Sequence, residues 1–250
     1  MPIVFEKVWK SFGDLEVIRG LDLEVADKES LVILGRSGSG KSVMLKLALG
    51  ILSPDRGQIT VDGEDINLIS LRDLYRLRQR FGMLFQGAAL FDSLTVWENV
   101  AFTMIEHEGK KMNEVMPLVQ EKLMVVGMPD VEYKYPAELS GGMKKRVGLA
   151  RAIASNPKYL LYDEPTTGLD PIMADVINNL IIKMNKELGT TSIVVTHDIV
   201  SATKVGTRLV MLYNGVIIWS GTPEETRNTD DPYVKQFIAG SAEGPIEVLT

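Results

Sequence analysis

The sequence contains Gly35-Arg36-Ser37-Gly38-Ser39-Gly40-Lys41-Ser42, which fits the pattern G-x-x-x-x-G-K-[ST]. It follows the apolar run 31–34 and precedes a helical pattern from Ser42 to Leu49. In this context backbone N–H groups close around phosphate oxygens, and the positive end of the helix favours an anion. Lys41 can reach the β- and γ-phosphates, and the Ser42 hydroxyl can ligate Mg²⁺. The stretch predicts a phosphate-binding loop, with a chance glycine-rich turn as the alternative.

A second apolar run ends in two carboxylates. Residues 159–162 read as a buried strand, and Asp163 and Glu164 follow it directly. The carboxyl ends of parallel strands face the ligand crevice of an open α/β sheet. We therefore expect Asp163 to hold Mg²⁺, usually through water, and Glu164 to polarise an attacking water. The alternative is that both acids only begin an exposed loop.

Composition sets the class of protein. The 250 residues are 45% hydrophobic and 24% charged, which indicates one or two globular domains and excludes a disordered chain. The net charge of −6 argues against nucleic-acid partners and against direct adhesion to anionic lipid. There is no Cys, which excludes disulfides and thiolate sites and is consistent with a cytoplasmic location.

No apolar stretch approaches the roughly 18–20 residues that cross a bilayer, and the N-terminus lacks the form of a signal peptide. At a membrane, another protein would have to hold this chain.

Alternating strand and helix patterns predict an α/β fold with a mostly parallel sheet flanked by helices. An alternating N-terminal stretch, with apolar residues from Ile3 to Val25, predicts an N-terminal β subdomain of antiparallel strands. Residues 87–158 read as an inserted helical subdomain. We expect one domain over residues 1–240 and a C-terminal tail over 241–250.

Periodicity places the remaining elements. Strands are expected at residues 58–61, 81–85, 193–195 and 208–213, with helices at 96–105, 115–126, 140–154, 172–188 and from Asp198. In the long helix an apolar residue recurs every four positions, which predicts one buried stripe of Ile172, Val176, Leu180, Met184 and Leu188. Asn214-Gly215 predicts a hairpin turn.

Another helix start has a composition suited to anions. Ser140 is a good N-cap, and Gly141 and Gly142 permit close backbone approach. The alternative is an ordinary capped helix.

Taken in order, these motifs resemble the ATP-binding subunit of an ABC transporter over nearly the whole chain. The resembling positions are Gly35–Ser42, Gln86, Leu139–Met143, Leu160–Glu164, Gly168–Asp170 and His197. The resemblance implies the ABC ATPase fold, ATP and Mg²⁺ as cofactors, and ATP hydrolysis coupled to transport. It also implies a head-to-tail homodimer in which each ATP lies between residues 35–42 of one copy and Ser140, Gly141 and Gly142 of the other. Residues 87–158 would meet an integral-membrane permease.

The resemblance also implies roles for single residues. Phe12 would stack on adenine, although a core aromatic at a strand end is an alternative. Gln86 would sense Mg²⁺ and water, and His197 would contact the γ-phosphate. Asp170 would couple the two sites of the dimer, and it is also a good N-cap before Pro171. The other histidine, His107, is interpreted as a surface residue.

A finer resemblance concerns residues 87–102, Met143 and Gly244-Pro245-Ile246, which are similar to the ATPase of Mla-type phospholipid transport systems. It implies transport of lipid between bacterial membranes through a permease, with an MCE-domain protein and a small STAS-domain protein in the complex. The chain would lie on the cytoplasmic side of the inner membrane and bind no lipid itself. Residues 87–102 offer apolar side chains to a permease helix, or simply pack within the helical subdomain. Met143 departs from the family's usual Gln, so any polar contact of that side chain is in doubt.

Other functions remain open at this point. The chain is alternatively an ABC ATPase for another small substrate or a P-loop kinase, although the Ser-Gly-Gly helix and His197 have no purpose in a kinase. A GTPase is disfavoured because residues 185–188, Asn-Lys-Glu-Leu, lack the Asp of the guanine-reading motif. A coiled-coil repair ATPase is disfavoured because Ser140 lies only 99 positions after Lys41. Glu164 and His197 argue against a binding module without turnover.

Overall fold

A computed structural model describes residues 3–106 and 108–247. The chain divides into two compact units, and the boundaries fall after Ile69 and after Ile193. The first unit contains the residues up to Ile69 and those from Val194 onward, and the second contains Ser70–Ile193. Strand β8 (Thr191–Thr196) contains the second boundary.

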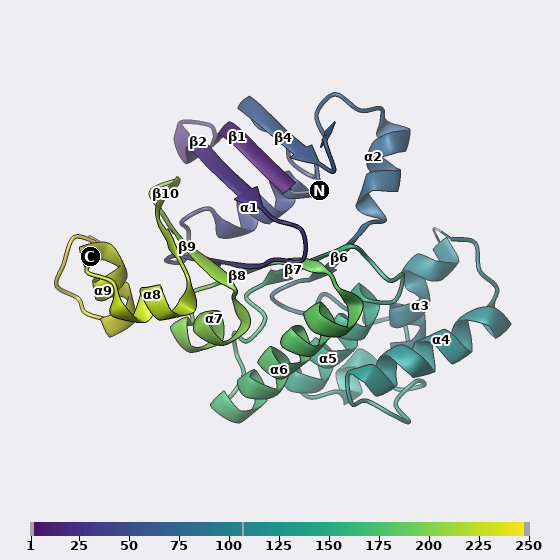
Figure 1. The fold of residues 1–250 in the computed structure, drawn as a ribbon. Coiled ribbons are helices and arrows are strands. Elements are labelled where there is room, and N and C mark those ends of the chain that lie inside the picture. The colour runs from purple at the N-terminus through teal and green to yellow at the C-terminus, as the bar shows by residue number, and fades with distance from the viewer. Residues whose placement is uncertain (1–2, 107, 248–250) are drawn as a thin grey trace. The chain divides into compact units, whose positions relative to one another are not determined.

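The first unit contains both ends of the described chain (Figure 1). Its elements are β1 (Ile3–Phe12), β2 (Leu15–Val25), β3 (Ser30–Leu34), α1 (Lys41–Ala48), β4 (Arg56–Val61), β5 (Glu64–Asp65), α7 (Ile199–Val205), β9 (Arg208–Tyr213), β10 (Val216–Gly221), α8 (Pro223–Asn228) and α9 (Pro232–Ala239).

An antiparallel sheet with the strand order β2-β1-β4-β5 begins the chain. Ile3 pairs with Val25 and Phe5 with Leu23, and all four side chains are buried. The alternation of apolar residues thus gives the sheet one buried face. This confirms the predicted antiparallel subdomain.

Strand β3 pairs in parallel with β9, with Leu31 opposite Arg208 and Leu34 opposite Met211. All five residues of β3 are buried, and they include the apolar run 31–34 that predicted a covered strand. β9 returns as β10 through Asn214 (φ 47°) and Gly215 (φ 79°). Two successive positive φ angles favour Asn-Gly, so the predicted hairpin is confirmed.

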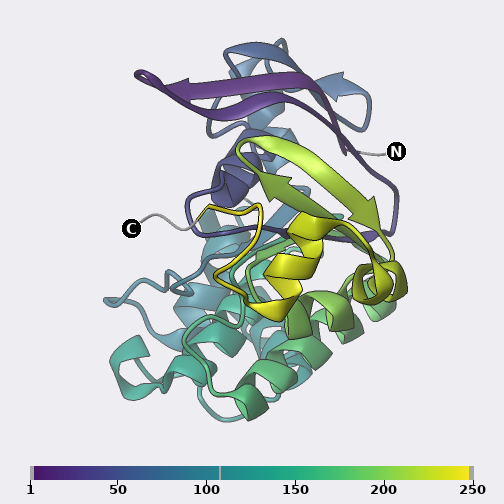
Figure 2. The same ribbon diagram turned by 90° about the vertical axis from the view of Figure 1, so that its left-hand side faces the viewer.

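The C-terminal residues close onto the β9–β10 hairpin and α9, as the yellow segments of Figure 2 show. Ile246 is 5% exposed and packs in a cluster with Met211 and Val234. The Gln236 side chain accepts from the Ile246 N–H at 2.6 Å and donates to the Ile246 carbonyl at 3.1 Å. These contacts hold residues up to 246 on the first unit.

The second unit combines two strands with most of the helices. Its elements are α2 (Leu71–Arg78), β6 (Phe81–Leu84), α3 (Val96–Glu106), α4 (Met112–Val125), the 3₁₀ turn η1 (Pro136–Glu138), α5 (Gly141–Ala152), β7 (Tyr159–Asp163) and α6 (Pro171–Leu188).

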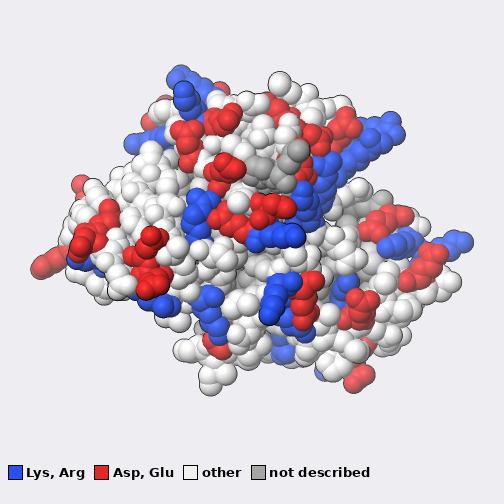
Figure 3. Space-filling view, viewed as in Figure 1, with Lys and Arg blue, Asp and Glu red and all other residues white. Residues whose placement is uncertain are grey.

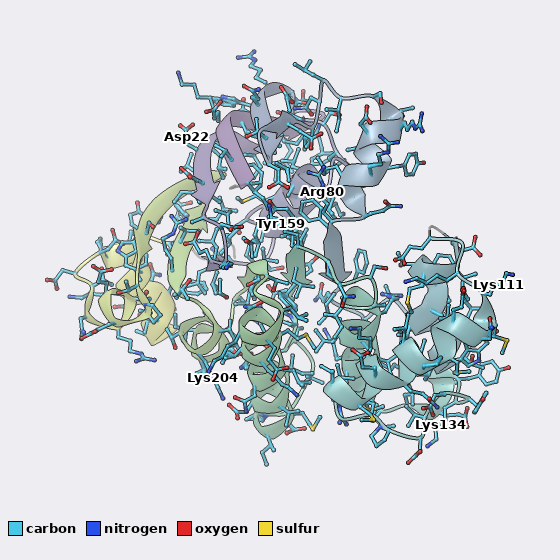
Figure 4. All side chains as sticks on the ribbon, turned by 45° about the vertical axis from the view of Figure 1, so that its right-hand side comes forward. Asp22, Arg80, Lys111, Lys134, Tyr159 and Lys204 are labelled. Carbon is cyan, nitrogen blue, oxygen red and sulfur yellow. The ribbon has the colours of Figure 1, made fainter. Side chains whose placement is uncertain are left out.

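The strands β6 and β7 pair in parallel from Phe81 and Tyr159 to Leu84 and Tyr162. At their start the Arg80 carbonyl accepts from the Lys158 and Tyr159 N–H groups at 2.8 and 2.9 Å, and Figure 4 shows Arg80 and Tyr159 at this end. The Phe81 and Tyr159 rings stack at 4.8 Å. The parallel register carries the carboxyl ends of both strands to the same edge.

Helices α3, α4 and α5 all fall within residues 87–158, which confirms that this segment is largely helical. Helix α3 contacts both α4 and α5. The boundaries proposed for the helical subdomain and for the tail remain predictions. Within residues 3–106 and 108–247, none of the helices combines the length and apolar character that crossing a membrane requires.

The stripe predicted for α6 is wrong except at Met184. Ile172 is 78% exposed and Leu188 40%, while the buried apolar side chains are Ile177, Ile181 and Met184. A helix turns about 100° per residue, so an exact spacing of four drifts about 40° at each step. Spacings of four and then three keep residues on one face.

Candidate functional site

The phosphate-binding loop, residues 35–42, lies in the first unit between β3 and α1. Gly38 (φ 80°) and Gly40 (φ 102°) adopt the left-handed backbone that glycine accepts without strain. A Cβ on Gly35 would lie 2.6 Å from the Leu212 carbonyl oxygen, so the backbone comes too close for a side chain. The sequence therefore needs glycine at these positions to form the loop.

Polar groups of the loop are arranged as a phosphate site requires. The Lys41 ammonium donates to the carbonyls of Gly35 at 2.7 Å and Arg36 at 3.0 Å, and the residue is 6% exposed. The Ser39 Oγ is buried and has no hydrogen-bond partner among the described residues. Ser37 and Gly38 are exposed, and Ser42 lies at the start of α1. This cradle fits the phosphates of a nucleotide.

Two more predicted residues of the first unit are accessible to a ligand. Phe12 ends β1 and is 46% exposed, so it is available for stacking, and the Lys10 ammonium lies 5.7 Å from its ring centre. His197 directly follows β8 and is exposed. Asp198 caps α7 by accepting from Val200 and Ser201, so the turn containing His197 is fixed.

The carboxylates lie in the second unit at the end of β7. Asp163 is 8% and Glu164 9% exposed. Glu164 has φ 47°, an unusual conformation for a residue with a side chain. The Thr167 Oγ1 donates to the Glu164 carboxylate at 3.1 Å. The acids are therefore held in a buried turn, and the alternative of an exposed loop is wrong.

Gln86 and Glu164 are connected by a lysine that sequence reasoning missed. Lys145 of α5 is 5% exposed, and its ammonium donates to the Gln86 carbonyl and, at 3.2 Å, to the Glu164 carbonyl. Burial lowers the pKa of Lys145, while the negative charges of Asp163 and Glu164 oppose that effect. The side chain of Gln86 is exposed.

The helix α5 begins at the predicted motif. Ser140 caps it by accepting from the Met143 N–H at 3.3 Å, and Ser140 and Gly141 are exposed. A Cβ on Gly142 would lie 2.7 Å from the Met173 Cε. Met173 belongs to the first turn of α6, which Asp170 caps by accepting from Ile172 and Met173 at 3.0 Å. The starts of α5 and α6 therefore lie together, with Asp170 exposed beside them.

Residues 87–102 form an ordered segment around Asn99, which is fully buried. Its amide donates to the carbonyls of Phe91, Leu94 and Thr95 at 2.9–3.1 Å and accepts from the Phe91 N–H at 2.8 Å. Arg151 donates to the carbonyls of Ala88 and Ala89, both of which have positive φ. Burial lowers the pKa of this arginine. The other histidine in the prediction, His107, lies outside the described residues.

A hollow of about 420 Å³ opens beside this segment, between α2, β6 and α5. Its lining combines aromatic side chains with cations, among them Tyr75, Arg78, Phe81, Phe85 and Arg151. Basic side chains gather over α2 in Figure 3. Sequence reasoning missed this hollow because α2 itself was not predicted.

Together the fold and the glycine-rich loop define an α/β nucleotide-binding protein. Residues 18–167 match the family model described as ABC transporter, and the chain belongs to that family.

Named relatives agree with this assignment. The chain is 42% identical to the probable ribonucleotide transport ATP-binding protein mkl of Mycobacterium leprae, over 95% of this chain and 68% of that protein. It is 41% identical to the intermembrane phospholipid transport system ATP-binding protein MlaF of Haemophilus influenzae, over 94% of this chain and 89% of that protein. A dimeric, post-hydrolysis structure of the ATP-binding cassette MJ0796 with ADP and Pi superposes with a TM-score of 0.81 and 31% identity. It covers 88% of this chain and 98% of that chain. The family and the ABC ATPase fold expected from the sequence are confirmed.

Proposed function

We propose that the chain hydrolyses ATP to ADP and phosphate and thereby powers phospholipid transport between bacterial membranes through a partner permease. The observation that carries this proposal is the similarity to the H. influenzae phospholipid transport protein over 89% of that protein's length. The complete set of motifs supports turnover, because the phosphate loop, the buried carboxylates and the capped Ser140 helix are all present.

In this proposal the first unit binds the nucleotide. Lys41 neutralises phosphate charge, and the loop amides of residues 35–42 orient the phosphates. The loop residues assigned to nucleotide are Gly35, Arg36, Ser37, Gly38, Ser39, Gly40, Lys41 and Ser42. Phe12 stacks on adenine and His197 contacts the γ-phosphate.

Hydrolysis depends on the second unit. Glu164 orients and polarises the attacking water, and its buried position with a fixed carboxylate suits a positioned base. Of the residues assigned to Mg²⁺, Gln86 and Asp163 belong to the second unit and Ser42 to the first, and each offers an oxygen atom of the kind that Mg²⁺ prefers. When bound, Mg²⁺ neutralises charge on the transferring phosphoryl group.

A homodimer completes each site in this proposal. Ser140, Gly141 and Gly142 contact the nucleotide of the second copy, and Asp170 couples the two sites. The exposed starts of α5 and α6, where Ile172 is 78% exposed, offer a surface for that contact. Closure of the dimer would then precede turnover.

The partner in the membrane is a permease, and the hollow lined by Tyr75, Phe85 and Arg151 is a suitable receptor for one of its short helices. An MCE-domain protein and a STAS-domain protein complete the proposed complex. The chain itself is peripheral on the cytoplasmic side of the inner membrane, binds no lipid and uses no nucleic acid.

A second candidate is transport of another small substrate, because the M. leprae relative is named for ribonucleotide transport and is 42% identical, against 41% for the H. influenzae relative. Isolating the tagged chain with its complex from native membranes distinguishes the two candidate functions. Recovery with a permease, an MCE-domain protein and phospholipid supports lipid transport. Recovery with a binding protein for a soluble solute overturns it. In the same preparation, phosphate release from ATP without an acceptor excludes a kinase.

A further inference from the structure

Lys145 lies where three functional segments of the second unit meet. It belongs to the second turn of α5, the helix that Ser140 caps. Its two acceptors, the carbonyls of Gln86 and Glu164, follow the neighbouring parallel strands β6 and β7. One ammonium group therefore connects the helix to the carboxyl ends of two strands.

A buried ammonium group at this place is costly. Lys145 is 5% exposed, and an apolar side chain of similar length would fill the same volume without losing hydration. The nearby carboxylates of Asp163 and Glu164 and two carbonyl acceptors offset that cost. Packing alone therefore does not account for a lysine here.

Glu164 is held in a conformation that needs support. A positive φ on a residue with a side chain is unfavourable and persists where neighbouring groups hold it in place. Its carbonyl accepts from the Lys145 ammonium at 3.2 Å and from the Thr167 N–H at 3.3 Å. Its carboxylate accepts from the Thr167 hydroxyl at 3.1 Å. Lys145 and Thr167 thus fix the main chain and the carboxylate of Glu164 from two sides.

From this geometry we infer that Lys145 is a positioning residue for ATP hydrolysis, which holds the main chains of Glu164 and Gln86 in register and so aims the Glu164 carboxylate. The inference rests on the proposed function. Lys145 acts through these two residues, and its ammonium is occupied by their carbonyls. Its loss should therefore slow the chemical step and leave ATP binding unchanged.

The test compares Lys145→Met with Lys144→Met in the intact transporter complex. Met approximates the length of the lysine stem and removes both the charge and the donors. Lys144 is the adjacent residue of α5 and is only half-buried, so it controls for the loss of one positive charge. A displacement of the catalytic group by about 1 Å costs on the order of 100-fold. We expect kcat to fall about 10- to 100-fold in Lys145→Met and to change less than about twofold in Lys144→Met.

Four further measurements separate positioning from a structural role. The affinity for a fluorescent ATP analogue should match the wild type in Lys145→Met, and the variant should still unfold in one transition well above the assay temperature, although the two carbonyls lose a donor. Lys145→Gln, which keeps two N–H donors, should recover part of the lost kcat. In the Glu164→Gln background, Lys145→Met should cause no further loss of the residual rate, because the group that it aims is already inactive.

Several outcomes overturn the inference. They are an unchanged kcat in Lys145→Met, an equal loss of kcat and ATP affinity, no recovery in Lys145→Gln, or an additive loss in the Glu164→Gln background. Phosphate release by the wild-type complex distinguishes a failure of the proposed function from a failure of the role of Lys145. If the wild type releases no phosphate, the proposed function fails; if it does and Lys145→Met matches it, only the role of Lys145 fails.

Discussion

Asn99→Ala should release the segment of residues 87–102 from the helical part of the second unit. Asn99 is fully buried and makes four hydrogen bonds to the backbone of Phe91, Leu94 and Thr95. The amide NH2 group has two hydrogens for three acceptors, so we count two donated bonds and one accepted bond. At about 0.5–1.5 kcal/mol net each, these sum to about 1.5–4.5 kcal/mol. Phe91 is exposed and Leu94 and Thr95 half-buried, so water replaces part of what is lost. We expect a loss of about 1.5–4 kcal/mol in the free energy of unfolding.

Urea unfolding measures that loss, and amide hydrogen exchange locates it. The Phe91 N–H donates to Asn99 and should exchange faster, whereas the Val96 N–H, which donates to the Lys134 carbonyl at 2.8 Å, should keep more of its protection. Asn179→Ala is the matched control, since exposed Asn179 makes one side-chain bond to Asp175 at 3.0 Å. Equal stability of the two variants, with Phe91 still protected, would refute the reasoning.

Three other outcomes follow from the site and the tail. Lys41→Ala should lose most ATP affinity in calorimetry, because the cation of the phosphate loop is gone; unchanged binding contradicts its role. Glu164→Gln should bind ATP, release almost no phosphate and remain as a closed dimer on gel filtration; normal turnover removes Glu164 from its role. Gln236→Ala should lower the free energy of unfolding by about 1–3 kcal/mol and expose residues 241–247 to proteolysis, because the buried Ile246 N–H and carbonyl lose their partner. If residues 241–247 stay uncleaved in that variant, the Gln236–Ile246 hydrogen bonds do not hold the tail in place.

Local signals in the sequence were sufficient for several elements. The all-apolar run before Gly35 gives β3, Asn214-Gly215 gives the β9–β10 turn, and Asp170-Pro171 gives the start of α6. In each case the deciding physics involves residues close together in the chain, namely sterics, capping or burial on both faces. Such features are predictable without knowing what packs against them.

Other helices were missed for two different reasons. α8 and α9 carry readable signals, since Thr222-Pro223 and Asp231-Pro232 place a capping residue before a helix-initiating proline. In α2 the pattern itself misleads, because Leu71 and Tyr75 are exposed and Leu77 is its buried residue. Because Leu71 and Tyr75 face solvent while Leu77 is buried, the sequence of α2 does not show the periodicity of a helix packed on a core.

The site residues likewise divide into those that a local motif predicts and those that only tertiary contacts reveal. Ser140, Asp163 and Lys41 have motifs because backbone geometry and short spacing fix their role. Lys145 and Thr167 act through tertiary contacts with Glu164, and a lysine in a helix otherwise indicates a solvated face.

At Met143, in contrast, the side chain departs from the family's usual residue and the local structure is unaffected. The Ser140 cap uses the Met143 N–H, which every residue except proline supplies, so the cap tolerates the departure from glutamine. The conformation of this helix start therefore depends on backbone groups and tolerates a change of side chain. The conformation of the turn at Glu164 depends on particular side chains, those of Lys145 and Thr167.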